Sequence, residues 1–384
     1  MTVELHDRLQ RLETWESPEI PVISLYLNLR PAFEERKTVA PRLRNLLEPI
    51  SEQAKNLDHD GREALRQSVA RVLAREPEIA ANTGHCVALF VGGRPELDEF
   101  VTLPRKAWDT AVALPRPYLR PYLATLDQFH LIAAVVVDPR LSSVTLSYMG
   151  EVLDHTEIES PPIRKSDFAG WQGLDEHRVR HHADEVHRRQ YRQVAEHLQR
   201  LGQEHEIDVI FVGGREEAVA AFLHQLPAAL GSQVAATFTI DLHTATPAQI
   251  AKITAELEAR FEEQEEQNLV TSVLEASRAG GLGVVGLEDT LQAANLGAVD
   301  LLLIGGTEMV PGYTCGNCGW LDLKGPVCPS CGETSTASPD IVESLAVKVR
   351  RASARAEHVL TPSDLNGIGV GARLRFPLPS GFGA

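Results

Sequence analysis

The chain has 384 residues, of which 43% are hydrophobic, and it carries a formal net charge of −16 at pH 7. This length is sufficient for two or three domains, each with its own hydrophobic core. Sequence-independent binding to nucleic acid depends on Lys and Arg neutralising phosphates, so the acidic balance excludes DNA as a partner and leaves only local contacts with RNA.

The N-terminal residues Met1–Asp7 have neither the basic start nor the apolar core of a signal peptide. No run in the sequence approaches the roughly 18 apolar residues of a membrane-spanning helix. We therefore expect a cytoplasmic protein without a membrane partner.

The first predicted domain covers residues 1–128 and has an α/β pattern. A strand is predicted at Val22–Leu27, a helical region with one break at Arg42–Glu76, and a second strand around Cys86. Because Cys86 lies in an apolar run, we interpret it as a small buried thiol and assign it no role. The proline-rich segment Pro115–Pro121 is predicted to be a linker.

The second predicted domain covers residues 129–245. Its expected order is three strands, a projecting loop, a long helix rich in arginine and histidine, and then a strand, a helix and a strand. The strands and the shorter helix are predicted at Leu131–Val137, Val144–Tyr148, Val152–Ile158, Ile207–Val212, Glu216–Leu226 and Val234–Ile240.

The most informative segment of this domain is the loop that opens into the long helix. After Pro161-Pro162 the loop reads Ala169-Gly170-Trp171-Gln172-Gly173, and its two glycines allow backbone angles that residues with a Cβ avoid. The pattern indicates a projecting loop, followed by positive charge, that enters phosphate-rich surroundings. The alternative is an ordinary surface loop before a solvated amphipathic helix. The arginines behind the loop are Arg178, Arg180, Arg188, Arg189 and Arg192.

The third predicted domain covers residues 246–384. A long helix starts at Thr246-Pro247 and ends near Ser277. Its glutamates are expected to form a solvated face. They are Glu256, Glu258, Glu262, Glu263, Glu265 and Glu266. The later elements are a helix, a strand, a helix and a closing pair of strands, predicted at Leu287–Asn295, Val299–Ile304, Asp340–Arg351, His358–Leu360 and Gly371–Phe376.

Four cysteines in the third domain form two Cys-x-x-Cys pairs, with a glycine after each pair. This spacing is typical of a structural zinc site, in which four thiolates complete the tetrahedron and leave no open position for water. Disulfides are the alternative, but a cytosolic chain keeps its thiols reduced. We therefore predict a Zn²⁺ ion in a ribbon inserted at about residues 306–333, with the ligands Cys315, Cys318, Cys328 and Cys331.

Two further patterns carry weaker hypotheses. His177, His181 and Asp184 lie three or four residues apart on a helix and could ligate a metal, but the neighbouring arginines would oppose a cation. Glycine pairs also follow three apolar strands, and none continues into a nucleotide-binding motif. We interpret these pairs as strand-end turns and expect no bound nucleotide. The pairs are Gly92-Gly93, Gly213-Gly214 and Gly305-Gly306.

The order of these elements resembles the archaeal and eukaryotic peptide-chain release factor family, which includes Pelota-type rescue factors and Balon-like bacterial hibernation factors. The resemblance spans most of the chain. It implies three α/β domains, of which the middle one is ribonuclease-H-like and the last is an α/β/α sandwich with an inserted zinc ribbon. Besides the loop and the arginine-rich helix, the segments on which the resemblance rests are Ser24–Leu27, Gly283–Thr290, Leu296–Ile304, Gly367–Gly369 and Leu374–Phe376.

In that family the loop of the middle domain carries Gly-Gly-Gln into the peptidyl-transferase centre, where it promotes attack of water on the ester between peptide and tRNA. Gly170 and Gln172 match the first and third positions, but Trp171 replaces the central glycine. An indole would crowd a loop that positions water with backbone groups, and it could instead stack on an unpaired base. The first domain has no counterpart of the Asn-Ile-Lys-Ser stop-codon motif, so termination at stop codons is not expected.

The resemblance therefore implies a ribosome-binding protein that acts at the vacant A site and the peptidyl-transferase centre, in hibernation or rescue of idle or stalled ribosomes. Its RNA-binding residues would be Gly170–Gly173 and the arginines of the following helix. A translational GTPase such as elongation factor Tu is a candidate partner. One alternative is an enzyme, a peptidyl-tRNA hydrolase in which Gln172 orients water. Another is a scaffold or stress-response protein with an inactive release-factor fold.

Overall fold

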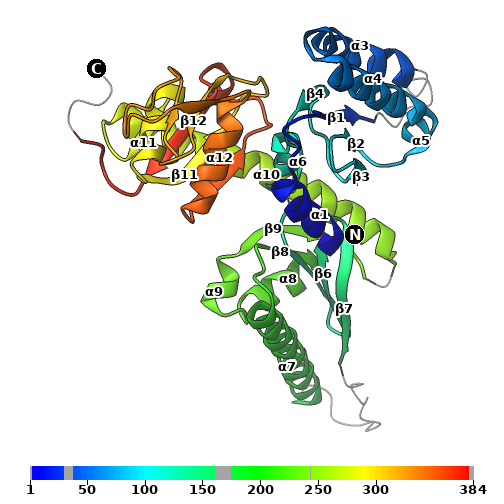
Figure 1. Cartoon of the computed structure of the whole chain (residues 1–384). Coiled ribbons are helices and arrows are strands. Elements are labelled where there is room, and N and C mark those ends of the chain that lie inside the picture. The colour runs from blue at the N-terminus through cyan, green and yellow to red at the C-terminus, as the bar shows by residue number, and fades with distance from the viewer. Residues whose placement is uncertain (1, 30–37, 128, 161–173, 243, 380–384) are drawn as a thin grey trace. The chain divides into compact units, whose positions relative to one another are not determined.

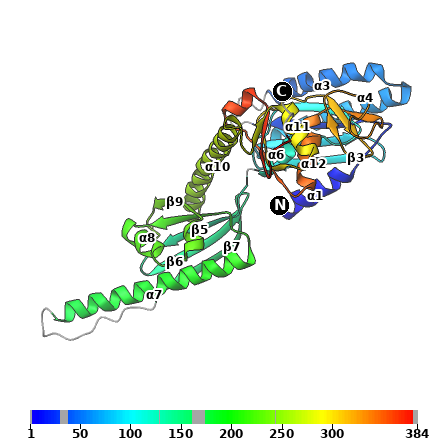
Figure 2. The same ribbon diagram turned by 90° about the vertical axis from the view of Figure 1, so that its left-hand side faces the viewer.

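The chain folds into two compact units, which Figures 1 and 2 show in a computed structural model. Residues 1–128 and 265–384 form the first unit, and residues 129–264 form the second. The mixed α/β architecture predicted from the sequence is confirmed, whereas the division into domains of 1–128, 129–245 and 246–384 stays a prediction. The structure describes residues 2–29, 38–127, 129–160, 174–242 and 244–379.

The N-terminal part of the first unit is an antiparallel sheet with α3, α4 and α5 packed on one face. Its elements are α1 (Thr2–Thr14), β1 (Val22–Asn28), α3 (Val39–Gln53), η1 (Ala54–Asn56), α4 (His59–Ala74), α5 (Glu76–Ala81), β2 (Cys86–Gly92), β3 (Leu97–Leu103) and β4 (Thr110–Leu114). The strand order is β3-β2-β1-β4. Alternate side chains of β1, Ile23 and Leu25, share a buried core with Leu43 of α3 and Leu65 of α4.

Cys86 is fully buried in β2, and this burial raises the pKa of its thiol to about 12. The predicted buried thiol is therefore confirmed. The strands β3 and β4 have no counterpart in the sequence prediction, because their mixed polar and apolar residues give only a partly buried pattern.

The segment Pro115–Pro121 is anchored in the first unit, so its prediction as a linker is wrong. Tyr118 and Arg120 are at most 1% exposed. Helix α6 (Arg120–Asp127) starts inside the segment, and the Tyr26 hydroxyl donates to the carbonyl oxygen of Tyr118 at 2.6 Å. The prolines are typical of a linker, but the large side chains between them are part of the core.

The C-terminal part of the first unit is an α/β/α sandwich. Its elements are the end of α10 (Pro247–Arg278), β10 (Gly283–Val285), α11 (Leu287–Asn295), β11 (Val299–Ile304), α12 (Ile341–Arg351), β15 (Arg355–His358), η2 (Asp364–Gly367) and β16 (Val370–Leu374). Leu302 and Ile304 of β11 pack with α11 and α12 on one face of the sheet. Leu301 and Leu303 pack with α10 on the other face, so the predicted sandwich is confirmed.

The predicted pairing of the two closing strands is wrong. The strand order is β10-β16-β11-β15, so β11 lies between the two, antiparallel to β16 and parallel to β15. Both strands exist near their predicted positions. Their partner is a strand some fifty or more residues earlier in the chain, which a local hydrophobic pattern does not record.

A second, smaller sheet is inserted between β11 and α12. It contains β12 (Gly312–Cys315), β13 (Leu321–Asp322) and β14 (Ser335–Ser338) in the antiparallel order β13-β12-β14. The insertion lies where the sequence predicted it, and β14 extends it by a few residues. We call residues 306–338 the ribbon.

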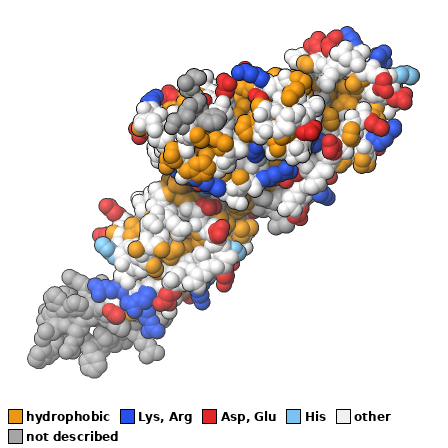
Figure 3. Space-filling model, turned by 60° about the vertical axis from the view of Figure 1, so that its left-hand side comes forward, with side chains coloured by type: hydrophobic (Ala, Val, Ile, Leu, Met, Phe, Trp, Pro, Cys, Tyr) orange, Lys and Arg blue, Asp and Glu red, His pale blue; other side chains and the backbone are white. Residues whose placement is uncertain are grey.

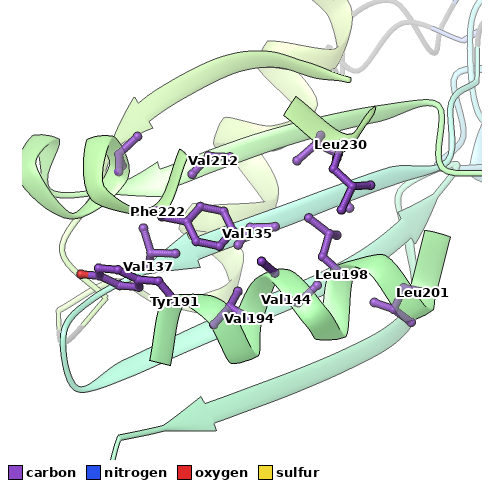
Figure 4. Close-up of a cluster of buried hydrophobic side chains, with 14 of the residues drawn as sticks. Val135, Val137, Val144, Tyr191, Val194, Leu198, Leu201, Val212, Phe222 and Leu230 are labelled. Atoms are coloured by element: carbon purple, nitrogen blue, oxygen red, sulfur yellow. The ribbon is translucent and has the colours of Figure 1, made fainter. Parts of the chain in front are cut away.

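The second unit has the strand order β7-β6-β5-β8-β9, in which the first three strands are antiparallel and the last three parallel. Its elements are β5 (Ile132–Val137), β6 (Leu141–Tyr148), β7 (Glu151–Glu159), α7 (Leu174–Glu204), β8 (Val209–Gly214), α8 (Glu216–Leu223), α9 (Ala228–Gly231) and β9 (Val234–Thr239). This is the strand arrangement of a ribonuclease-H-like domain, as predicted. Helices α7 and α8 cover one face through the core of Figure 4, where Val194, Leu198 and Phe222 meet Val135.

Helix α10 carries glutamates on a buried face, so its prediction as wholly solvated is wrong. Glu258 and Glu266 are 6% and 5% exposed. The carboxylate of Glu266 accepts hydrogen bonds from the backbone N–H groups of Leu360 and Thr361, at 3.2 and 2.8 Å. Buried carboxylates with such partners satisfy local backbone donors. No helix among the described residues is long and apolar enough to cross a membrane.

Candidate functional site

The four cysteines of the ribbon converge on one point. Their sulfur atoms all lie within 4.8 Å of one another. Two sulfur pairs, Cys315 with Cys331 and Cys318 with Cys328, are 3.6 Å apart. A tetrahedral zinc ion with bonds of about 2.3 Å places its sulfur ligands about 3.8 Å from one another. The arrangement therefore fits a tetrahedral thiolate site for a metal ion such as zinc.

Two matching turns build this site. In each turn the glycine after the second cysteine donates its N–H to the carbonyl oxygen of the first cysteine, from Gly319 to Cys315 and from Gly332 to Cys328, both at 2.9 Å. The glycines have φ angles of 69° and 78°. This left-handed region disfavours other residues. The positive φ angles thus explain why a glycine follows each cysteine pair in the sequence.

The first turn favours a thiolate at Cys315, whereas burial and the neighbouring thiols raise the pKa of Cys318 to about 11. Hydrogen bonds from the backbone N–H of Cys318, and more weakly Asn317, lower the pKa of Cys315 to about 6. Lys348 of α12 donates to the carbonyl oxygen of Gly319 at 2.7 Å. Burial lowers the pKa of Lys348, while the negative charges of Cys318 and Cys328 oppose this fall. Zinc bound by four thiolates would be structural, because no coordination position stays open for a substrate.

The predicted basic helix is α7. Its inward residues, Tyr191, Val194 and Leu198, are at most 3% exposed and recur at helical spacing. Arg188, Arg189 and Arg192 are exposed on the other side of the helix. Figure 3 shows basic side chains gathered on this part of the second unit. The helix is therefore amphipathic, with a core face and a basic outer face.

Gln190 anchors α7 to the sheet, a role that the sequence analysis did not predict. The residue is 1% exposed, and its side-chain oxygen accepts a hydrogen bond from the Ser160 hydroxyl at 2.7 Å. Its amide nitrogen donates to the Ile158 carbonyl oxygen and to the Ser142 hydroxyl, at 3.2 and 3.3 Å. These contacts hold the helix at the end of β7, directly before the predicted loop. The only signal in the sequence is a glutamine adjacent to the core-facing Tyr191.

Arg140 lies at the same end of the sheet and was also missed. Its carbonyl oxygen accepts a hydrogen bond from the backbone N–H of Ser160 at 2.8 Å, and its side chain is exposed. The turn between β5 and β6 therefore adds a fourth exposed arginine to Arg188, Arg189 and Arg192 of α7.

Several predicted residues lie outside the described part of the structure. The loop residues Gly170, Trp171, Gln172 and Gly173 are among them. The backbone of α7 is described from Leu174, but the side chains of its first residues are not. These side chains include Arg178, Arg180, His177, His181 and Asp184.

The pair Gly213-Gly214 is explained by packing. A Cβ on Gly213 would lie 2.3 Å from the Phe238 ring, and one on Gly214 would lie 2.4 Å from the Val137 carbonyl oxygen. Gly214 also has a φ of 147°. The pair is a strand-end turn in which side chains do not fit.

Comparison with known proteins finds a similarity to the family that the sequence patterns resemble. Residues 117–262 match the family model described as bacterial archaeo-eukaryotic release factor family 10. An uncharacterised protein of Mycobacterium tuberculosis is 26% identical over 275 residues, which make up 70% of this chain and 72% of that protein.

Solved structures give weaker likenesses. Dom34 of S. cerevisiae, described as a translation termination-like factor, is 12% identical over 75% of this chain and 74% of its own, with a TM-score of 0.41. The archaeal translation termination factor aRF1 is 17% identical over 97% of each chain, with a TM-score of 0.26. Scores this low support no conclusion by themselves. Over residues 117–262, the chain is therefore similar to the bacterial archaeo-eukaryotic release factor family.

Proposed function

We propose that this protein is a release-factor-like factor that binds the ribosome at a vacant A site and reaches the peptidyl-transferase centre. It would act in hibernation or in rescue of idle or stalled particles. The observation that carries this proposal is the family match over residues 117–262, which includes the ribonuclease-H-like sheet, the Gly170–Gly173 loop and the basic helix α7 together.

The second unit has the features that such a task requires. Its sheet and the Gln190 contacts give the base of the loop a rigid support. Arg140, Arg188, Arg189 and Arg192 offer exposed positive charge for phosphates of ribosomal RNA. The rest of the chain is acidic, with a net charge of −16 for the whole protein, so binding to RNA would be confined to this region.

Trp171 favours binding over hydrolysis. A tryptophan at this position can stack on an unpaired base, a contact worth about 1–3 kcal/mol. The alternative function is a peptidyl-tRNA hydrolase, which the match of Gly170 and Gln172 to the Gly-Gly-Gln pattern favours. The proposed protein partner is a translational GTPase such as elongation factor Tu, and the ribbon, with zinc bound, would have a structural role.

Cosedimentation with purified ribosomes over a salt titration tests the proposal. We expect wild-type protein to bind vacant ribosomes, and the double variant Arg188→Glu with Arg189→Glu to bind more weakly and with a smaller salt dependence, because fewer phosphates are neutralised. The matched control is Arg44→Glu with Arg66→Glu, which makes the same charge change at exposed positions of α3 and α4. Equal binding of all three proteins would reject a role for the basic helix. Failure of the wild type to bind would favour the scaffold alternative.

A further inference from the structure

The ribbon is joined to the α/β sandwich by two side chains that no motif in the sequence marks. The ammonium of Lys348 on α12 donates to the Gly319 carbonyl oxygen at 2.7 Å and to the Asn295 side-chain oxygen at 2.8 Å. Asn295, at the end of α11, pairs with the backbone of Leu321 in both directions. Its amide nitrogen donates to the Leu321 carbonyl oxygen at 2.7 Å, and its oxygen accepts from the Leu321 N–H at 2.9 Å.

These contacts lie next to the metal site. Gly319 is the turn glycine that directly follows Cys318, and Leu321 is 3% exposed in the core shared by α11 and α12. The first cysteine turn is therefore fixed to the sandwich on both sides of Trp320. Both turn glycines, Gly319 and Gly332, are exposed and have open space around them, so the hydrogen bond from Lys348 is what anchors the first turn.

The charges explain why a lysine is suited to this position. Four thiolates and one Zn²⁺ ion together carry a net charge of −2, which is costly to hold at a protein surface that is partly closed to water. Lys348 is the cation whose hydrogen bond reaches the cysteine turn, and Cys318 and Cys328 are the thiolates whose charge it feels. Groups that neutralise or orient metal ligands from outside the coordination shell commonly change metal affinity by about 10–100-fold.

We propose that Lys348 is the counter-charge of the four-cysteine zinc site and, together with Asn295, couples zinc binding to the packing of the ribbon on α11 and α12. Lys348 is a positioning residue, since it binds the turn and not the metal. The inference concerns the metal site alone and does not depend on ribosome binding.

Zinc affinity of the full-length protein, measured by competition with a chromophoric chelator, tests the proposal. We expect Lys348→Met to lower the affinity about 10–100-fold and Lys348→Arg to retain most of it, because arginine restores the charge. The control is Lys324→Met. This lysine also lies in the ribbon, but its side chain is 84% exposed and forms an ion pair with Glu288. That variant should bind zinc like the wild type.

Further readouts separate the charge from simple loss of packing. Asn295→Ala keeps Lys348 and should weaken zinc binding while increasing hydrogen exchange at the Leu321 amide, because that amide loses its acceptor. If Lys348→Met fails to fold, Lys348→Gln gives the same comparison with a polar side chain in place. Wild-type affinity in Lys348→Met, or an equal loss in the Met and Arg variants, would overturn the proposal. So would a loss in Lys324→Met as large as that in Lys348→Met.

Discussion

Trp171 is the residue whose identity most affects the proposed activity. In the proposed alignment it takes the place of the central glycine of Gly-Gly-Gln, and its neighbours Gly170 and Gln172 match the outer positions of that pattern. A side chain at this point is expected to crowd the water that a hydrolytic loop must hold, whereas an indole offers a flat surface for a base.

The Trp171→Ala variant is expected to bind ribosomes about ten to a hundred times more weakly than the wild type, since one stack is worth about 1–3 kcal/mol. Trp171→Phe, which keeps an aromatic ring, is the control and should retain much of the affinity. Peptide release from ribosome-bound peptidyl-tRNA is measured in parallel and should be low for the wild type. Efficient release that Gln172→Ala abolishes would make the hydrolase alternative the better one.

Glu343 gives the first unit a dependence on pH. Its carboxylate accepts a hydrogen bond from the Leu119 N–H at 2.8 Å, and burial, with a smaller contribution from Asp340, raises its pKa to about 7 from an ordinary 4.5. The folded protein therefore holds a proton that the unfolded chain loses at lower pH. The contribution of Glu343 to the free energy of unfolding is therefore fully present below about pH 4.5. It is lost as pH rises through about 7, a change on the order of 3 kcal/mol.

The Glu343→Gln variant should flatten this dependence. Urea unfolding at about pH 5 and about pH 8 measures it, and the free energy of unfolding should fall between these pH values by less in the variant than in the wild type. Glu333→Gln, at an exposed ribbon position, is the control and should keep the wild-type slope. Parallel slopes for all three proteins would show that Glu343 does not titrate in this range.

At the scale of elements, α6 and α12 are joined by a buried ion pair. Arg120 donates to the Asp340 carboxylate at 2.9 Å, with the two side chains 2% and 1% exposed, and the Tyr118 hydroxyl donates to the same oxygen at 3.0 Å. Arg120 also donates to the carbonyl oxygens of Gly306 and Glu308. The other carboxylate oxygen of Asp340 caps α12 through the Val342 N–H.

Asp340→Asn is expected to destabilise the first unit by about 3–5 kcal/mol, because it leaves the Arg120 charge buried without its partner. Asp300→Asn is the matched control, since Asp300 pairs with Arg373 at 2.8 Å but both side chains are more than 40% exposed. An exposed pair of this kind contributes about 0–1 kcal/mol. The two free energies of unfolding are compared in urea, and similar losses would contradict the assignment of the buried pair.

Some elements could be predicted from local sequence and others could not, for physical reasons. The helix Leu287–Asn295 and the strand Val299–Ile304 have the predicted bounds, because strong periodicity and a glycine turn define them. The short strands β3, β4 and β10 lack such a pattern. Pro115–Pro121 was misleading because proline signals a break in regular structure and does not report burial.

The candidate sites divide in the same way. The cysteine spacing predicts the cluster of four thiols, because two local turns build it. Gln190, Lys348 and Asn295 could not be predicted, since their partners lie 26–53 residues away in the chain. Contacts of that range depend on the fold and leave no pattern in neighbouring residues.

At the scale of the whole molecule, the charge is distributed unevenly, because an acidic chain carries one basic surface on the outer face of α7. The chain is acidic overall, yet the family match covers the region that contains this face and the loop before it. A protein of this kind should bind RNA only where the loop can enter a defined site, and should show little affinity for free nucleic acid.

A cryo-electron-microscopy map of vacant ribosomes incubated with the protein tests the central claim most directly. We predict density for the second unit in the A site, with α7 along ribosomal RNA and residues 170–173 at the peptidyl-transferase centre. The same map made with Arg188→Glu and Arg189→Glu should have lower occupancy, for the electrostatic reason given above. Density elsewhere on the ribosome, with the loop away from the peptidyl-transferase centre, would contradict the account, as would the absence of bound protein under conditions that saturate the site.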